Sequence, residues 1–486
     1  MLVRVMAIAL ALSAPIFASQ TVFNAPTVNN SFAPLGNLDV LAESSFTTFA
    51  HPAFPNYSVR IKKSDFCDGT VAEARHLFFY FFESRNDPDT DDVVFWTNGG
   101  PGCSSAVGLF MELGPCRVNN ATKGTEYHPE SWNSNANVFF IDQPIGVGFS
   151  YADYGEYVTA QSTTEEAAQD IAAFVAIFFV HFSKFQGRGF HMAGESYGGR
   201  YIPAFAAAVY DQNAYLIEAG IPPINLTSIM IGNGMTDVPT MMTAWYNIQC
   251  SSASVAPVQT IQRVFRAYSC LSLTGFQDMR SHETKESCED VFDVINCASA
   301  MDFCIESLRD PYVTMGLNTY DLTTRCDGVE LCYSIMDTVV TFLNRKDIQS
   351  TLGVDPARAA YSSCSPEVMA DFGRLSYDLM HGSTEYVAGL LERGVRALVY
   401  AGSYDFVCNW LGNDAWTRAL EWSGRQAFAG TPLREWTTKD GAKAGKTRSA
   451  GGLTFATIYG AGHMAPYDKP KESLEMAQRW IAGKEL

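Results

Sequence analysis

A short glycine-bounded segment places a serine where it could act as a nucleophile. Residues 194–198 read Gly-Glu-Ser-Tyr-Gly, a G-x-S-x-G pattern that a chain of 486 residues contains by chance about one time in six. The context makes the pattern informative, because residues 190–193 are expected to form a strand and the residues after Gly199 a helix. A serine on a tight turn between strand and helix exposes its hydroxyl. Ser196 is therefore the candidate nucleophile.

A serine hydroxyl attacks only when a base takes its proton and an acid fixes the tautomer of that base. Three histidines follow Ser196, and two of them fall within or beside a cysteine-rich stretch. The third, His463, comes just after the last expected strand, and Asp405 directly follows the strand expected over residues 397–400. The order Ser, Asp, His is that of the α/β-hydrolases, so we predict a triad of Ser196, Asp405 and His463.

A glycine-rich segment could bind the oxyanion of a tetrahedral intermediate. Residues 96–105 read Trp-Thr-Asn-Gly-Gly-Pro-Gly-Cys-Ser-Ser and directly follow an apolar strand. An oxyanion hole needs the backbone N–H after the nucleophile, here that of Tyr197, and a second from an early glycine-rich loop, for which Gly100 is predicted. A tight turn closed by Pro101 is the alternative interpretation of this segment.

The elements that must position these residues alternate along the chain, as in an α/β sheet. Strands are expected over residues 76–82, 93–96, 138–141, 190–193, 229–231, 397–400 and 453–459. The longest apolar run, residues 171–180, is too short to span a membrane and should be a buried helix. We predict an α/β-hydrolase fold with a mixed, mostly parallel sheet.

The pattern changes between the two parts of this predicted core, residues 51–237 and 380–486. Eight of the twelve cysteines fall within residues 238–379, and strand-like runs nearly vanish there. We expect this stretch to be a disulfide-stapled, mostly helical insertion that acts as a cap.

The composition narrows the function classes. Hydrophobic residues make up 47% and charged residues 18%, and the net charge is −18 without a long basic run, which argues against a nucleic-acid partner. The glycine-rich stretches lack the spacing of nucleotide-binding loops, and there is no pair of C-x-x-C motifs. We therefore expect no cofactor and no metal.

Several features indicate the secretory pathway. Residues 1–18 have the charged start, apolar run and small-residue end of a signal peptide, and residues 19–50 form either a propeptide or a loose N-terminal arm. Twelve cysteines predict disulfides in an oxidising compartment. Glycosylation sequons occur at Asn29, Asn56, Asn120 and Asn225. A vacuole or lysosome and the cell exterior both remain open as destinations.

Six segments in order resemble the serine carboxypeptidase family, most closely its carboxypeptidase Y and plant type III branches. They are residues 96–105, 194–197, 231–234, 399–402, 408–413 and 462–466. The resemblance runs from about residue 45 to the end. It implies a serine exopeptidase that forms an acyl-enzyme and releases C-terminal residues with apolar side chains from peptides and proteins.

The resemblance also implies a site for the free carboxylate of the substrate. Asn98 and the Gly99 backbone would donate hydrogen bonds, and Glu112 and Glu195 would bind the carboxylate through a proton that they share. Two neighbouring carboxyls cannot both ionise cheaply, so one pKa should rise and carboxylate binding should weaken as the proton leaves. We therefore expect activity at acidic pH.

Further roles follow from the same resemblance. Cys408, as a free thiol, and Met464 would line the side-chain pockets on either side of the scissile bond. Two disulfides are implied, Cys103–Cys364 and Cys326–Cys332. The cysteines left are an odd number, so at least one thiol or an unusual pairing follows; they are Cys67, Cys116, Cys250, Cys270, Cys288, Cys297 and Cys304.

The chain departs from the family pattern in places. Thr97 stands where Leu is usual, and Gly198-Gly199-Arg200 where Ala-Gly-His is typical. Two alternatives stay open: an acyltransferase on the same scaffold, and a non-catalytic stabilising partner in a lysosomal or vacuolar complex. Glu195 favours hydrolysis, because the acyltransferases commonly carry Asp there, and the intact triad argues against a non-catalytic role. Both a monomer and a homodimer are compatible with the sequence.

Overall fold

The sheet is the element on which the candidate site is built. In the computed structural model it contains twelve strands among the described residues, in the order β1-β2-β3-β4-β8-β5-β9-β10-β11-β14-β13-β12. The structure describes residues 77–151, 163–250, 293–326, 328, 330–355, 360–375 and 377–486. It also describes three strands that precede these ranges: β1 (Thr47–Ala50), β2 (Ser58–Lys63) and β3 (Thr70–Ala74). The expected signal peptide and the sequons at Asn29 and Asn56 lie outside the described residues.

All seven strands expected from apolar runs are present. They are β4 (Leu77–Phe82), β5 (Val93–Thr97), β8 (Asn137–Ile141), β9 (Phe190–Glu195), β10 (Leu226–Gly232), β11 (Arg396–Gly402) and β14 (Leu453–Ile458). The strands from β8 to β14 in the sheet order pair in parallel, and the flanking strands pair antiparallel. The mixed, mostly parallel sheet is thus confirmed.

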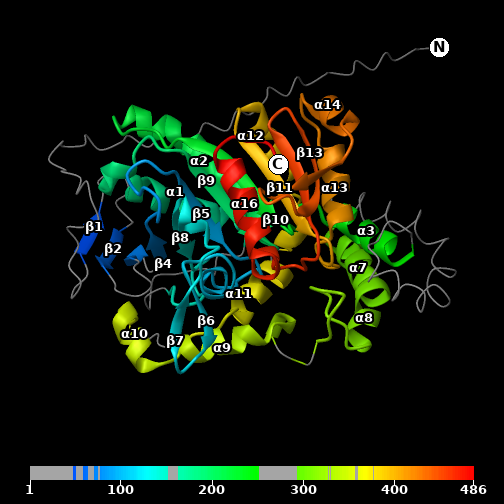
Figure 1. Cartoon of the computed structure of the whole chain (residues 1–486), viewed down its shortest axis with the longest axis horizontal. Helices are drawn as coiled ribbons and strands as arrows, with labels where there is room; N and C mark the ends of the chain where they lie inside the picture. Colours follow the sequence, from blue (N-terminus) through cyan, green and yellow to red (C-terminus); the bar gives the residue numbers. More distant parts are fainter. Residues whose placement is uncertain are drawn as a thin grey trace, which may run out of the picture.

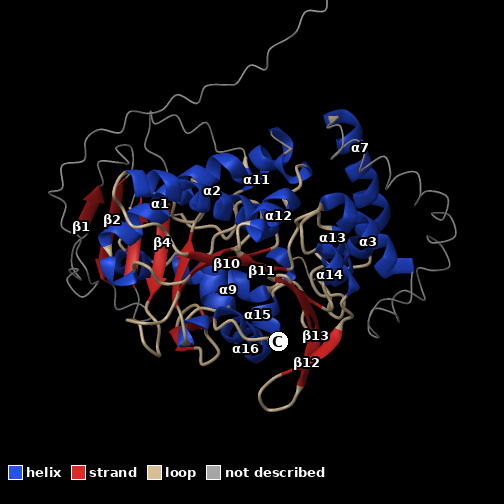
Figure 2. Ribbon diagram, turned by 90° about the horizontal axis from the view of Figure 1, so that it is seen from above, coloured by secondary structure: helices blue, strands red, loops and turns tan. Residues whose placement is uncertain are grey.

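Helices cover both faces of the sheet. On one face lie α1 (Thr164–His181), α2 (Gly198–Glu218) and α12 (Thr384–Glu392), and on the other lie α9 (Ser334–Leu343) and α16 (Pro470–Ile481) (Figures 1 and 2). Because side chains alternate along a strand, β4 sends Phe79 and Phe81 into the α1–α2 core and Tyr80 into the α9–α16 core. Residues buried on both faces explain the continuous apolar runs.

The helix expected over residues 171–180 is α1, whose N-cap Thr163 accepts a hydrogen bond from the Glu166 N–H at 3.3 Å. Its apolar residues are buried within the protein core. No helix among the described residues is both long and apolar enough to cross a lipid bilayer.

The described part of residues 238–379 is helical and contains no strand. Its α-helices are α3 (Val238–Cys250), α7 (Val294–Cys304), α8 (Asp310–Thr314), α9, α10 (Lys346–Leu352) and α11 (Pro366–Ala370). In Figure 1, α9 and α10 lie below the sheet, and α3, α7 and α8 lie at the right of the view, where α3 packs against α13 (Trp410–Ala419). The boundaries of an insertion remain a prediction.

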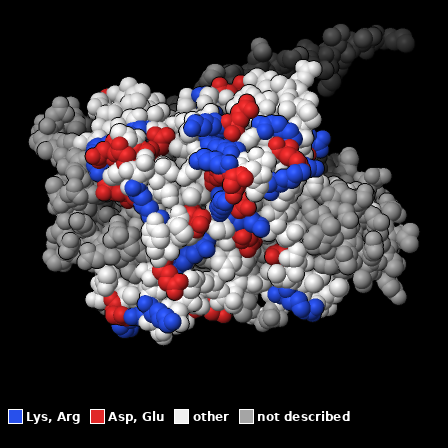
Figure 3. All heavy atoms as spheres, viewed as in Figure 1, with Lys and Arg blue, Asp and Glu red and all other residues white. Residues whose placement is uncertain are grey.

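The charged side chains on the face drawn in Figure 3 are mixed in sign. Lys and Arg alternate with Asp and Glu over the described part of that face, so it offers no broad basic surface.

Phe178 is the centre of an aromatic cluster that fixes α1 to the sheet. The centroid of its ring lies 4.4 Å from that of Phe139 and 5.1 Å from that of Phe81, and the residue is 1% exposed. We predict that Phe178→Ala lowers the free energy of unfolding by about 3–5 kcal/mol, because it removes this packing and leaves a cavity. Urea denaturation measures the loss. Ile217→Ala, at a 61% exposed position of α2, should change it by less than about 0.5 kcal/mol.

Candidate active site

Ser196 lies on the turn that the sequence predicts. Strand β9 ends at Glu195, and α2 begins at Gly198. The φ of Ser196 is 63°, in the left-handed region that non-glycine residues seldom adopt. Two backbone hydrogen bonds hold this conformation: Ser196 N–H donates to Gly232 O at 3.0 Å, and Met235 N–H donates to Ser196 O at 2.9 Å. The neighbouring strand β10 and the loop after it therefore support the strained turn.

Asp405 and His463 meet at the carboxyl ends of β11 and β14. His463 Nδ1 lies 2.7 Å from Asp405 Oδ2, and the residues are 2% and 1% exposed. In the tautomer whose Nδ1–H donates to this carboxylate, Nε2 is the ring nitrogen left to accept a proton, as the predicted base requires. A backbone hydrogen bond also holds the loop that carries His463, because its N–H donates to Tyr320 O at 2.7 Å.

Asn233 supports the acid of this pair and was not predicted from the sequence. Its Nδ2 donates to Asp405 Oδ2 at 2.8 Å, and its Oδ1 accepts the N–H of Gly402 at 3.1 Å. The Cys408 N–H donates to the other Asp405 oxygen at 3.3 Å. The carboxylate is thus fixed toward His463 by donors from two loops. Asn233 lies in a segment that resembles the family, but its partner is 172 residues away in the sequence.

Cys408 lies close to Ser196 and to the Asp405–His463 pair. Its side chain is hydrogen-bonded to Ser196, and its sulfur lies within 4.8 Å of a ring nitrogen of His463 and a carboxylate oxygen of Asp405. Burial, followed by the charges of Asp405 and Glu195, raises the pKa of the thiol well above its ordinary value. A protonated thiol is a poor nucleophile and a poor metal ligand, so Cys408 does not compete with Ser196, the predicted nucleophile.

The loop after β5 crosses the Ser196 turn without room for a side chain. A Cβ on Gly99 would lie 2.4 Å from Tyr197 N and 2.8 Å from Ser196 Cβ. Only glycine fits, and this contact places Gly100, with a φ of +115°, next to the predicted oxyanion donor Tyr197. The structure therefore brings together the two segments that were expected to form an oxyanion hole.

The buried carboxylate of Asp142 holds the same glycine-rich loop through hydrogen bonds. Asp142 Oδ1 accepts the Ser104 hydroxyl at 2.5 Å and the Ser105 N–H at 3.1 Å, and its Oδ2 accepts the Phe149 N–H at 3.1 Å. Burial raises the pKa of Asp142 to about 6, although these hydrogen bonds oppose the shift. Asp142 was not predicted, because nothing in its own segment identifies its partners.

A buried polar cluster contains Asn98, Glu112 and Glu195. Its last member, Glu195, directly precedes Ser196 in the sequence. Glu112 ends the π-helix η3 (Gly108–Glu112). Asn98 Nδ2 donates to Glu112 Oε1 at 2.9 Å, while its Oδ1 accepts the Trp96 indole N–H and the Gly108 N–H, both at 2.9 Å. These partners fix the orientation of the Asn98 amide.

The carboxyl groups of Glu112 and Glu195 interact electrostatically, and Oε2 of each is buried without a hydrogen-bond partner in the described structure. Glu112 is 0% and Glu195 2% exposed. Burial, followed by the charge of Glu112, raises the pKa of Glu195 well above its ordinary value, and burial also raises the pKa of Glu112. Two neighbouring buried carboxyls cannot both ionise cheaply, so this environment favours the protonated form of one of them.

Met464 lies in a small apolar cluster beside His463. The buried members are Val107, Met111, Tyr333, Met336 and Met464. Met464 directly follows the predicted base, and Cys408 lies against Ser196, so the two residues expected to line side-chain pockets both lie near the predicted nucleophile and base.

Both implied disulfides, Cys103–Cys364 and Cys326–Cys332, are present. The first connects the glycine-rich loop to a segment 261 residues later, and Cys116 and Cys297 are also disulfide-bonded. Cys67, Cys270, Cys288 and the side chain of Cys250 lie outside the described residues. Asn120 and Asn225 are exposed, and glycosylation at both stays a prediction.

A second set of Ser, His and Asp residues lies toward the amino ends of the central strands, opposite the end that carries Ser196. His191 Nε2 is 3.1 Å from Asp92 Oδ2, and its Nδ1 is 2.7 Å from Ser228 Oγ. The Ser228 hydroxyl is fully buried and accepts the Trp480 indole N–H at 2.9 Å. A substrate carbonyl cannot reach it, so this set fixes α16 to the sheet.

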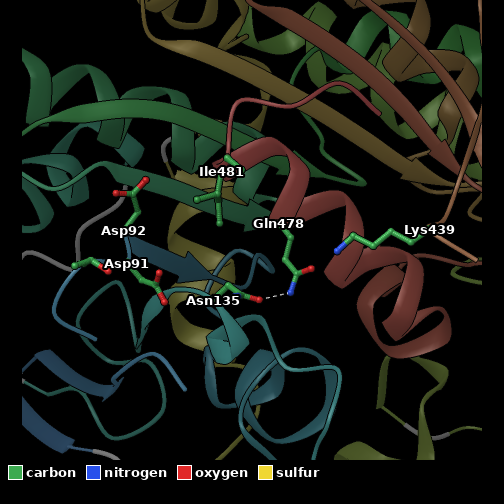
Figure 4. A pocket seen from close by; sticks show the side chains of 8 residues that line it. Asp91, Asp92, Asn135, Lys439, Gln478 and Ile481 are labelled. Carbon is green, nitrogen blue, oxygen red and sulfur yellow. Dashed lines mark hydrogen bonds between the residues drawn. The ribbon is translucent and has the colours of Figure 1, made fainter. Parts of the chain in front are cut away.

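A surface pocket lies near this second set (Figure 4). It is lined by Thr90, Asp91, Asp92, Asn135, Lys439, Gln478, Ile481 and Ala482. Asp92 comes just before β5, whereas Ser196 follows the carboxyl end of the parallel strand β9. The pocket is therefore separate from the candidate active site.

Comparison with known proteins agrees with this geometry. A family described as serine carboxypeptidase matches residues 52–483. Carboxypeptidase Y of Komagataella phaffii is 39% identical over 446 residues, covering 88% of this chain and 80% of the relative. Carboxypeptidase Y homolog A of Talaromyces stipitatus is 40% identical over 413 residues, covering 84% and 70%.

Among solved structures, the prohormone-processing carboxypeptidase Kex1Δp of Saccharomyces cerevisiae has a similar fold. The TM-score is 0.69 at 22% identity, and the match covers 88% of this chain and 91% of that one.

Asn233 offers a test of how the Asp405–His463 pair is held. We predict that Asn233→Gly, which suits the φ of 41° at this position, slows reaction of Ser196 with an organofluorophosphate about ten- to a hundredfold, because a hydrogen bond to a buried charge is lost. Asn344→Gly removes an amide that bonds only backbone groups far from Ser196 in the sequence, and it should retain the rate. Equal rates in both variants would contradict the assignment.

Proposed function

The chain belongs to the serine carboxypeptidase family, and from this premise we propose that Ser196 releases C-terminal residues with apolar side chains from peptides at acidic pH. The enzyme is a serine-type carboxypeptidase; its residue roles, substrate preference and pH range are what we propose. The observation that carries the proposal is the buried cluster of Asn98, Glu112 and Glu195 directly before Ser196.

An exopeptidase must recognise a free carboxylate next to the bond that it cleaves. In the proposed mechanism, Asn98, the Gly99 N–H and the shared glutamate proton donate hydrogen bonds to that carboxylate. A protonated glutamate pair can donate, whereas an ionised pair would repel an anion. The position of the cluster fixes the terminal residue of the peptide relative to Ser196.

The chemical steps then follow the triad. His463 Nε2 accepts the Ser196 proton as Oγ attacks the scissile carbonyl, and the N–H groups of Gly100 and Tyr197 stabilise the oxyanion. The C–N bond breaks as His463 protonates the leaving amine, which departs as a free amino acid. Water, deprotonated by His463, then hydrolyses the acyl-enzyme and restores Ser196.

Two further proposals rest on the surroundings of the site. The apolar cluster at Met464 and the protonated thiol of Cys408 support a preference for apolar side chains on both sides of the scissile bond. The expected signal peptide, the disulfides and the similarity to carboxypeptidase Y proteins support a destination in the secretory pathway, either the vacuole or lysosome or the cell exterior.

The first test compares a blocked dipeptide that ends in a free apolar residue with its C-terminal amide between pH 4 and 8. We predict cleavage of the acid that is strongest at low pH, weak cleavage of the amide, and loss of both in Ser196→Ala, because the amide cannot bind as a carboxylate. Release of the last residue is the readout. Acyl products formed with added amines or alcohols, without hydrolysis, would favour the acyltransferase alternative.

The glutamate pair determines the expected pH dependence of KM. Glu195, whose pKa is raised, keeps the shared proton at acidic pH and loses it as the pH rises through that pKa. We predict that the wild-type KM for the acid substrate rises with pH, whereas KM for Glu195→Gln stays flat, because an amide donates hydrogen bonds at every pH. Initial rates over the same pH range measure both values.

A matched control is Glu475→Gln, which alters a carboxylate of α16 that is 7% exposed. Its KM should follow the wild-type profile. A rising profile in Glu195→Gln would contradict the role of the shared proton.

A further inference from the structure

We propose that Asp378 is a positioning residue that holds the backbone N–H of Tyr197 toward the oxyanion of the reaction. The inference rests on the proposed acyl-transfer chemistry at Ser196. Asp378 begins the short helix η11 (Asp378–Met380), near the end of the predicted insertion, and is 1% exposed.

Four hydrogen bonds from two helix starts reach this carboxylate. Its Oδ2 accepts the Tyr197 hydroxyl and the Thr164 hydroxyl, both at 2.6 Å. Its Oδ1 accepts the Thr164 N–H at 2.9 Å and Arg200 Nη2 at 3.3 Å. Thr164 is the first residue of α1, and Tyr197 is the N-cap of α2. One carboxylate therefore ties α1 and the Ser196 turn to the segment that precedes α12, which packs beside α2 (Figure 2).

Arg200 supplies the positive charge that such a buried carboxylate needs. The residue is 2% exposed, and its Nε also donates to the Asp378 backbone oxygen at 3.3 Å. Its Nη2 forms a second ion pair with Glu165 at 2.6 Å. Leaving a buried charge without a partner is costly, so Arg200 and Asp378 depend on each other. This gives a physical reason for Arg200 at a position where the family typically has His.

The same contacts constrain the oxyanion donor. Tyr197 directly follows Ser196 with its positive φ, and a Cβ on Gly99 would lie 2.4 Å from Tyr197 N. At the other end of this residue, the centroid of the phenol ring lies 4.9 Å from that of Tyr201 and 6.2 Å from that of Phe372. The hydroxyl of Tyr197 donates a hydrogen bond to Asp378. Both ends of Tyr197 are thus held, which fixes the direction of its N–H.

Two substitutions separate positioning from general stabilisation. Tyr197→Phe removes only the hydroxyl, and Asp378→Asn removes the charge at nearly constant shape. Titration of Ser196 with an organofluorophosphate counts competent sites, so kcat is obtained per active site. We expect kcat per site to fall about tenfold or more in both variants while KM for the acid substrate stays within about twofold, because misdirecting an oxyanion donor affects the transition state.

Inhibitor binding supplies the readout that a purely structural role would not move. A peptide aldehyde forms a tetrahedral adduct with serine that uses the oxyanion hole, whereas a blocked amino acid with a free carboxylate uses only the carboxylate site. We expect both variants to bind the aldehyde more weakly by a factor that matches their loss of kcat/KM. Both should bind the carboxylate as wild type does.

The matched control is Asp414→Asn, in a buried pair with Arg448 whose atoms are 2.7 Å apart. It should lower the thermal midpoint without changing kcat per site or aldehyde affinity. The proposal is overturned if Tyr197→Phe and Asp378→Asn behave like this control.

Two complications leave the test intact. If Asp378→Asn does not fold, Tyr197→Phe decides alone. If wild type fails to cleave the acid substrate, the proposed function fails, while aldehyde binding and the rate of Ser196 phosphorylation still decide whether Asp378 positions the Tyr197 N–H.

Discussion

The close crossing of two loops is the constraint on which the site depends. The glycine-rich loop after β5 touches the turn after β9 with no space for a side chain at Gly99. Parallel pairing of the two strands brings their carboxyl ends to the same edge of the sheet, and the absent side chain permits the final approach. The residues predicted as nucleophile, oxyanion donors and carboxylate site then lie close together, because Asn98 and Glu195 immediately flank the crossing.

Buried carboxylates surround this crossing, and each is stabilised in a different way. Asp405 is compensated by His463 and the amide of Asn233, and Asp378 by Arg200 and hydroxyl groups. Burial raises the pKa of both Glu112 and Glu195, and in the proposed mechanism this pair keeps one proton. Burying several acids near one serine is costly, and the form of compensation determines what each can do.

The sequence predicted the parts of the structure that local patterns encode. Strands buried on both faces appear as apolar runs, so β4, β5, β8, β9, β10, β11 and β14 were found. The edge strand β12 (Arg434–Thr437) and its neighbour β13 (Lys443–Ala450) were missed, because their exposed positions carry Lys, Arg and Glu. Of the predicted triad, Asp405 and His463 are hydrogen-bonded, and Cys408 lies close to both of them and to Ser196. In the predicted carboxylate site, Asn98 donates to Glu112. Asn233 and Asp378 were missed, because their partners are 172 and 181 residues away and no local pattern links them.

The order of the site along the chain has a consequence for biosynthesis. The carboxylate cluster and Ser196 are translated first, Asp405 follows much later, and His463 comes after the last strand of the sheet. Domains begin to fold from the N-terminal side as they emerge from the ribosome. A nascent chain therefore contains Ser196 long before it contains His463, the base of the proposed mechanism. Without that base, a partly made enzyme would be unable to attack its neighbours during synthesis.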